Sequence, residues 1–479
     1  MKRNYFIAIA VAALFIGSTV AQAADVTFSG QFRPRMNIDN DASADTKNSQ
    51  FFDTRVRLNA KANVNANTEV FLQFQSVGVW GDDGADTNDG TRQSQGGGGD
   101  EASDILTDVG FHQAYLTLKN FAGYAVDAKI GRQEVVIDGH RLFGHTGWTQ
   151  GAETKDAIRL THSAGNHTLN YTFIAANEED NTSVADNLYD DDQVHILYAQ
   201  TQGVMGGKLS GIFTYTNDDS QQGTTIMDDQ EHWYTLGARQ AGKASGLDYR
   251  VEFYHQFGDA AAIANTAGYG QTGATADGGS VDRDAQMFGI RVGKTFKNVA
   301  WSPTVTLWYD YLSGTDDEDV ADGDHGAFNT MYDTGHKFYG LQDFYLSRAG
   351  AGTQYFGLED IAIKAKMSPK AGWTIKADLH HFRTATDISG GDADTMLTNL
   401  TDASTVINGA MDPDLGTELD LTLAHKYDAN TTISAGYSHY WTTNTFGQLN
   451  CGAAGNGGTC GSNSNDGSDW TYVQIDTKF

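Results

Sequence analysis

Apolar and polar residues alternate along most of this chain, in segments of about ten residues. In one segment Phe52, Val56 and Leu58 fall on one face, while Arg55 and Arg57 fall on the other. A period of two indicates a β-strand, because successive strand residues point to opposite faces, whereas a helix groups positions three and four apart. The pattern therefore predicts an all-β protein whose strands have one apolar and one polar face.

Eighteen segments carry this alternation, and the connections between them differ in length. The segments are residues 25–36, 51–62, 68–79, 109–118, 125–133, 153–163, 166–176, 193–201, 208–216, 231–241, 247–257, 285–295, 303–313, 356–367, 373–383, 416–427, 432–441 and 470–479. Short turns such as 65–67 and 428–430 follow the even-numbered segments, whereas longer loops rich in Gly, Asp and Asn, such as 80–108 and 314–355, follow the odd-numbered ones. An even strand number with this asymmetry predicts a transmembrane antiparallel β-barrel of about 18 strands.

The first residues differ from the rest of the chain. Lys2 and Arg3 precede a mostly apolar run over residues 5–20, which ends in Ala21-Gln22-Ala23. A run of about 16 residues before small residues is typical of a secretory signal peptide and short for a membrane helix. We therefore expect residues 1–23 to be a signal peptide and residues 24–479 to form one barrel domain.

Two further features concern single strands. Pro34 lies inside the first predicted strand, where it cannot donate a ladder hydrogen bond, so a β-bulge is expected there. The last predicted strand ends on Phe479, and outer-membrane proteins resemble this ending, with a terminal Phe that the insertion machinery reads.

Charge is divided between the loops and the strands. The chain holds 61 acidic and 32 basic residues, and about 44 of the acids lie in the long loops. The net charge of -29 argues against nucleic acid as a partner. A charge that faces lipid at mid-bilayer costs about 2 to 4 kcal/mol, so basic residues on the strands should face the lumen and favour anions. These lumen residues are Arg33, Arg35, Arg55, Arg57, Arg159, Arg239, Arg250, Arg291, Lys364 and Lys366.

An alternative is that acids on the same faces neutralise these cations. Glu252, Asp310 and Asp420 share the polar face of their strands, and ion pairs across strands would leave a wall with little selectivity. Excess positive charge is expected mainly in the first two strands, where four arginines accompany only Asp53. Arginine suits an anion path because it stays protonated and can hold a carboxylate through two hydrogen bonds.

Five sequence motifs together resemble the alginate export family of bacterial outer-membrane barrels. They are DTRVRL at 53–58, GRQE at 131–134, DGHRL at 138–142, TGHKFYG at 334–340 and LGTELDLT at 415–422. The resemblance covers nearly the whole chain, and the motifs stand in the family's order. It implies an 18-stranded barrel that passes an anionic polysaccharide or a related solute. It also implies that Arg132 and Arg141, which lie in two of the motifs, belong to the solute path.

An enzymatic role finds little support in the sequence. A hydrolase needs a nucleophile and a base within hydrogen-bond reach. Ser438 and His439 are adjacent in a predicted strand and so face opposite sides. Asp378 and His380 share a face, but no nucleophile accompanies them. The sequence therefore predicts a channel and not an enzyme.

The acid clusters of the long loops raise the question of calcium. Residues 316–319 are four consecutive acids, yet no run has the spaced pattern of a calcium loop with its following Glu. A solvated acidic surface is the simpler interpretation, and loop-bound Ca²⁺ is the alternative. No cofactor is expected.

These observations predict a channel in the outer membrane of a Gram-negative bacterium, for passive diffusion or export of an anionic solute such as an acidic saccharide. The alternatives are a general porin of weak selectivity and a surface receptor or adhesin built on the long loops. The apolar outer face would contact outer-membrane lipid and lipopolysaccharide. The sequence leaves the oligomeric state open.

We expect Cys451 and Cys460 to form a disulfide in the loop before the last strand, because an isolated pair in an oxidising compartment is most simply bonded. The bond should add roughly 2 to 3 kcal/mol in the chain-entropy model. Mass spectrometry of non-reduced peptides should find the two peptides linked, and two free thiols would contradict this. Strand pairing should still allow membrane insertion when both residues are changed to Ala.

Overall fold

The computed structural model describes residues 25–40, 49–81, 109–177, 192–218, 231–261, 280–322, 324–345, 353, 355–387, 412–446 and 467–479. The predicted signal peptide lies outside the described residues, and so do Cys451 and Cys460. Most of the long loops lie outside them as well. The signal peptide and the disulfide therefore stay predictions, and loop-bound calcium stays an untested alternative.

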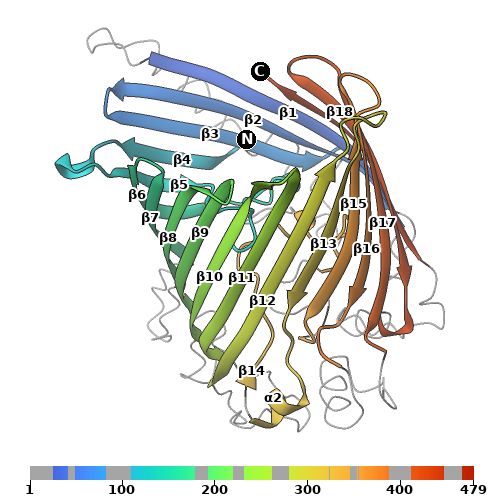
Figure 1. Cartoon of the computed structure of the whole chain (residues 1–479). Coiled ribbons are helices and arrows are strands. Elements are labelled where there is room, and N and C mark those ends of the chain that lie inside the picture. The colour runs from blue at the N-terminus through green and yellow to red at the C-terminus, as the bar shows by residue number, and fades with distance from the viewer. Residues whose placement is uncertain are drawn as a thin grey trace.

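Eighteen strands form one antiparallel barrel wall (Figure 1). They are β1 (Asp25–Asn40), β2 (Ser49–Asn65), β3 (Thr68–Val79), β4 (Gly110–Leu118), β5 (Asp127–Gln133), β6 (Lys155–Ala164), β7 (His167–Asn177), β8 (Asp192–Val204), β9 (Gly207–Asp218), β10 (Glu231–Ala244), β11 (Leu247–Ala261), β12 (Ser280–Thr295), β13 (Thr304–Leu312), β15 (Leu358–Met367), β16 (Trp373–Arg383), β17 (Asp414–Lys426), β18 (Thr431–Thr442) and β19 (Ser468–Lys478). Each of the 18 predicted segments is one of these strands, which confirms the predicted barrel.

The wall closes where the first strand meets the last. β1 pairs with β2 on one side and with β19 on the other, so the sheet has no free edge. Every other wall strand pairs with its neighbours in sequence, and β13 pairs directly with β15. The two residues of β14 (Asp324–His325) only bridge to β12.

Helical structure is short in the described residues. It comprises α2 (Asp317–Asp322), the 3₁₀ turns η1 (Phe121–Gly123) and η2 (Gly335–Lys337), and a helical turn at residues 444–446. None of the helices in the described part of the chain is long and apolar enough to cross a membrane.

The two faces of the wall differ as the alternation predicts. Phe28, Phe32 and Leu58 are exposed on the outer face, where a membrane barrel meets lipid. Arg33 and Arg55 are buried on the inner face. Pairing between strands satisfies the backbone N–H and C=O groups of the wall without help from side chains. The polar side chains of the inner face are therefore available for other partners inside the barrel.

The β-bulge expected at Pro34 is wrong. β1 keeps one register with β2 through the pair Pro34↔Thr54. On its other side the pairing with β19 stops after Phe32 and resumes at Arg35 in the same register. The missing proline N–H thus interrupts the ladder with β19 without the insertion of an extra residue.

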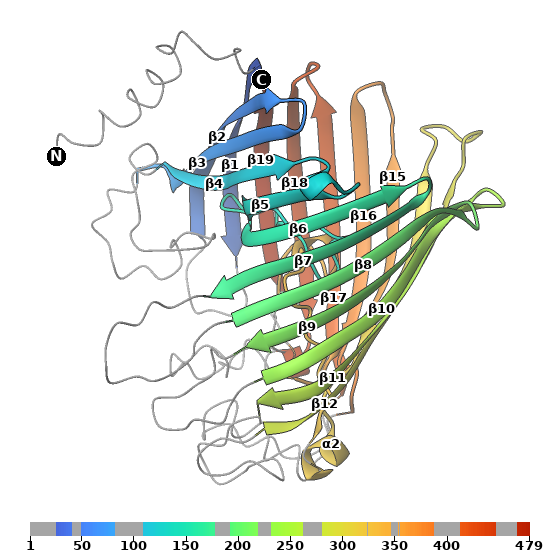
Figure 2. The same ribbon diagram turned by 90° about the vertical axis from the view of Figure 1, so that its left-hand side faces the viewer.

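Two segments fold into the lumen. The first inserted loop, residues 134–154, follows the short strand β5, and the second inserted loop, residues 326–345, lies between β13 and β15. Buried apolar side chains of both loops, such as Phe143 and Phe338, belong to one core inside the barrel. An isolated bridge between Phe143 and Tyr332 joins the loops. Figure 2 shows coloured loop segments in the interior of the barrel, enclosed by the strands of the wall.

Gly30 lies where β1 pairs with β19 to close the barrel, and a side chain at this position should be poorly tolerated. A Cβ there would lie 2.5 Å from the Phe479 ring and 2.8 Å from the Arg57 carbonyl oxygen. We expect Gly30→Val to lower the free energy of unfolding by about 1 to 3 kcal/mol through overpacking. The temperature at which the folded gel band disappears measures this loss.

Gly211→Val is the matched control, because Gly211 is also a strand glycine and a Cβ there has only the Gly237 carbonyl oxygen nearby, at 3.8 Å. It should leave the unfolding temperature nearly unchanged. Equal effects of the two substitutions would contradict the packing of Phe479 against Gly30.

Candidate functional site

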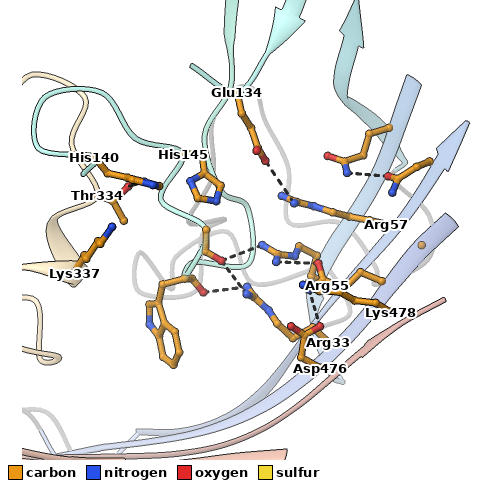
Figure 3. Close-up of a pocket in the computed structure, with 16 residues that line it drawn as sticks. Arg33, Arg55, Arg57, Glu134, His140, His145, Thr334, Lys337, Asp476 and Lys478 are labelled. Carbon is orange, nitrogen blue, oxygen red and sulfur yellow. Dashed lines mark hydrogen bonds and ion pairs between the residues drawn. The ribbon is translucent and has the colours of Figure 1, made fainter. Parts of the chain in front are cut away.

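A cavity of about 490 Å³ lies between the inserted loops and the wall formed by β1, β2 and β19 (Figure 3). Five cationic and two acidic side chains take part in its lining. The lining residues are Gly30, Gln31, Arg33, Arg55, Arg57, Asn59, Gln73, Glu134, His140, His145, Gly147, Trp148, Thr334, Lys337, Asp476 and Lys478. The cavity is therefore polar and carries an excess of positive charge.

The arginines reach this cavity through strand geometry. Arg33 and Arg55 are directly paired across β1 and β2, and Arg57 pairs with Gln31. Residues directly opposite on neighbouring strands point to the same face, with Cβ atoms about 5 Å apart. The structure thus brings together the arginines of the first two strands that the sequence predicted for the lumen, as Figure 3 shows.

Arg33 and Arg55 bind backbone carbonyls of the first inserted loop. Arg33 Nη1 donates to the Gly147 carbonyl at 2.8 Å, and Nη2 donates to those of Trp148 and Thr149 at 2.9 and 2.8 Å. Arg55 Nη1 donates to the Thr149 carbonyl at 3.1 Å. No carboxylate of the described residues lies within ion-pair distance of either guanidinium. Both charges are therefore hydrogen-bonded but not neutralised.

Arg35 and Arg57 do have acidic partners. Arg35 Nη2 lies 3.2 Å from Asp53 Oδ2, and Arg57 Nη1 lies 3.6 Å from Glu134 Oε1. Burial opposes ionisation of Glu134, but the hydrogen bond from His112 and the nearby positive charges outweigh it and hold its pKa below the usual value. Arg57 thus adds less net charge to the cavity than Arg33 and Arg55 do, and Arg35 is not among the lining residues.

The second inserted loop completes the opposite side of the cavity. Lys337 Nζ donates to the Gly139 carbonyl at 3.1 Å, and burial together with Arg250 and Arg239 lowers the pKa of Lys337. Burial and the neighbouring Lys337 lower the pKa of His140 to about 4. His140 is therefore neutral at physiological pH, and the positive charge of the cavity comes from Arg and Lys.

A second cluster of charges holds the first inserted loop against the part of the wall that contains β11 and β13. Arg141 is only 1% exposed and lies 3.1 Å from Glu252 Oε1 and 2.5 Å from Asp310 Oδ2. Its Nη1 also donates to the Tyr339 hydroxyl at 2.7 Å, which links the two loops. Burial alone would lower the pKa of Arg141, but the carboxylates raise it well above the usual value. Arg141 is an anchor inside the core.

Three wall arginines share the same acids. Arg239 and Arg250 lie 3.5 and 3.6 Å from Glu252, and Arg291 lies 3.4 Å from Asp310. The interpretation of a neutralised wall thus describes this side of the lumen, whereas the side of β1 and β2 keeps uncompensated arginines.

Comparison with known protein families agrees with this architecture. A profile of the family described as alginate export matches residues 24–456. The chain belongs to the alginate export family. No curated protein sequence matches it at a significant level.

Solved structures of similar fold are bacterial outer-membrane-type barrels. OccAB1 of Acinetobacter baumannii has a TM-score of 0.54 at 13% identity, over 95% of this chain and 96% of that chain. OccK9 (OpdG) of Pseudomonas aeruginosa has a TM-score of 0.54 at 12% identity, over 95% and 98%. A BenF-like porin from Pseudomonas fluorescens Pf-5 has a TM-score of 0.52 at 10% identity, over 95% and 98%. At such identities the likeness shows the fold alone.

The placement of Arg132 on the solute path, which its family motif implied, is wrong. Arg132 shares the outer face of β5 with Ile130, and its Nη2 lies 2.7 Å from Asp156 Oδ2. The two side chains are 50% and 53% exposed. Strand alternation decides this, because Arg132 lies an even number of residues from the outward Ile130. Of the two motif arginines, only Arg141 lies inside the barrel.

The remaining predicted lumen residues lie away from the cavity. Arg159 sits on the inner face of β6, opposite Lys129 of β5. Lys364 lies 3.4 Å from Asp378 Oδ2, and Lys366 is exposed on the inner face of β15. They extend the basic surface along the wall but do not join the arginines of β1 and β2.

Sequence reasoning missed the loop residues of the cavity. His140, His145, Trp148 and Lys337 lie in connections, where no alternation reports their direction. His140 and Lys337 lie inside two of the family motifs, and this was the one signal in the sequence that could have identified them as site residues. Only the inward fold of both loops brings them opposite β1 and β2.

The residues considered for catalysis form no catalytic group. Ser438 Oγ donates to Asp420, whereas His439 lies on the other face, 2.8 Å from Asp469 Oδ1. His380 Nδ1 pairs with Asp360 Oδ1 at 2.8 Å. The family and the fold are those of channels.

Replacing Arg141 should destabilise the inserted loops. Arg141→Met removes the closest cationic partner of two carboxylates whose side chains are both 0% exposed, so we expect the free energy of unfolding to fall by about 3 kcal/mol. Denaturant titration of the folded barrel measures the change.

Arg132→Met is the matched control, since it breaks an exposed ion pair worth about 0 to 1 kcal/mol. A loss of stability in the Arg132 variant as large as that in the Arg141 variant would disprove the anchoring role of Arg141.

Proposed function

We propose that this protein is an outer-membrane channel of a Gram-negative bacterium that conducts anionic solutes by diffusion, and acidic saccharides in particular. The observation that carries the proposal is the pair Arg33 and Arg55. Both face the cavity, and neither is neutralised by a carboxylate of the described residues. Fixed cations in a narrow, partly desolvated passage attract anions more strongly than the same charges do in bulk water.

The other lining residues suit a saccharide. Gln31, Asn59 and Gln73 bring neutral amides to the cavity, and amides both donate to and accept from hydroxyl groups. Lys337 and Lys478 add cations on other sides. A sugar acid needs both kinds of partner, because it carries one carboxylate among several hydroxyls. Membership of the alginate export family supports the same class of solute.

A general porin of weak selectivity is the second candidate. The pairing of Arg141, Arg239, Arg250 and Arg291 with acids favours it, since that side of the lumen contributes little net charge. A surface receptor or adhesin is the third, because the inserted loops occupy part of the lumen. A large single-channel conductance of the purified protein would exclude a plugged receptor.

Ion selectivity separates the first two candidates. We expect anion selectivity in the wild type, read as the reversal potential across a planar bilayer under a salt gradient. Arg55→Gln combined with Arg57→Gln should lower the anion-to-cation permeability ratio by about fivefold or more, since one charge at about 4 Å contributes about 1 kcal/mol even in water.

The control is Arg132→Gln, which removes a positive charge from the outer face and should leave the reversal potential unchanged. Cation selectivity of the wild type, or no shift when both lumen arginines are removed, would reject the anion path in favour of the weakly selective porin.

A further inference from the structure

One short segment of the first inserted loop forms the boundary of the cavity that faces β1 and β2. We call this segment, residues 147–150, the strap. Gly147 and Trp148 of the strap line the cavity. A movement of the strap away from the wall would therefore widen the cavity at this level.

The strap is held to the wall by arginine donors. Arg33 binds three of its backbone carbonyls, and Arg33 Nε donates to the Gln150 side chain at 2.9 Å. Arg35 Nη1 donates to the Trp148 carbonyl at 3.1 Å, and Arg55 Nη1 to the Thr149 carbonyl at 3.1 Å. The acceptors on the strap are all neutral oxygens.

The backbone is strained at both ends of the strap. Thr146 has a φ of 45° and Ala152 a φ of 58°, which is the left-handed region that residues with a Cβ rarely adopt. Such strain persists only where surrounding contacts impose it, and it is found at switch regions. The arginine bonds hold the strap in this conformation, and releasing them would let both ends relax.

A carboxylate in the cavity competes for the same donors. Arg33 and Arg55 line the cavity with the guanidinium groups that bind the strap. An ionised carboxylate is a stronger acceptor than a backbone carbonyl and can engage a guanidinium through two parallel bonds. The carbonyls that lose these donors can be solvated by water in the lumen.

We propose that the strap is a gate that the transported solute opens. A solute carboxylate takes over donors of Arg33 and Arg55, the strap carbonyls leave the wall, and the loop turns about Thr146 and Ala152, so that the passage widens. This inference rests on the proposed function, because it requires an acidic solute in the cavity. The solute shifts the equilibrium between the strap bound to the wall (the held state) and the strap away from the wall (the released state). It does so because the arginines have more free donors for its carboxylate in the released state.

The test measures pore width and selectivity in the same recordings. Single channels of the protein are recorded in KCl with increasing potassium glucuronate, or with glucose as the uncharged counterpart. Width is read from the largest neutral polyethylene glycol that enters the pore and lowers its conductance. We expect glucuronate to raise the size limit in a saturable way, and glucose to have no effect.

Two variants test the mechanism from opposite directions. Arg33→Met removes four of the eight arginine hydrogen bonds to the strap, so the pore should be wide without glucuronate and should not widen further. Ala152→Gly relieves strain in the held state, so more glucuronate should be needed for half of the effect. Arg132→Met, which alters only the outer face, should respond as the wild type does.

Several outcomes would overturn the gate. One is a pore whose size limit glucuronate leaves unchanged or lowers, because a fixed constriction would only be blocked. Another is an Ala152→Gly channel that responds at the wild-type concentration, and this variant stays informative even where Arg33→Met fails to fold. The reversal potential reports the proposed function separately, so an anion-selective pore of constant width would reject the gate alone.

Discussion

A charge on the wall of a lipid-embedded barrel is stable only when it points into the lumen, and most of this structure follows from that constraint. Side chains alternate between the two faces of each strand, so the guanidinium group of every arginine on the polar face points into the lumen. There it needs hydrogen-bond partners, because buried polar groups without them are costly. Arg132 is the instructive exception, since it points outward but is half exposed and paired with Asp156.

The inserted loops supply those partners and in turn depend on the wall. Arg33 and Arg55 of the wall bind carbonyl groups of the first loop. Glu418 of β17 does the reverse for the second loop, and its Oε1 accepts the backbone N–H groups of Leu341 and Gln342 at 2.7 and 3.0 Å. Backbone groups that a loop buries inside a barrel are thus satisfied by wall side chains of both signs.

The two sides of the lumen therefore have different roles. Around Arg141 the cations meet Glu252 and Asp310, and the result is a rigid anchor that joins both loops to the wall. Around Arg33 and Arg55 the partners are neutral carbonyls, so the charge remains available to a solute. A barrel that anchored its loops only through ion pairs would have no such free charge.

Sequence alone determined the barrel, because a period of two and the alternation of loop length are local properties of the chain. All 18 strands and the inward direction of Arg33, Arg55 and Arg250 follow from them. The same rule, applied to the register of β5, would have placed Arg132 outside, and only the family motif suggested otherwise.

Only the tertiary structure decided what the inward arginines contact. Alternation gives the direction of a side chain but not the path of a loop, and Trp148 and Lys337 meet the wall because both inserted loops fold inward. Whether a lumen arginine is neutralised depends on which residues of distant strands and loops lie within a few ångströms. That distance is set by packing across the barrel, which a one-dimensional pattern does not contain.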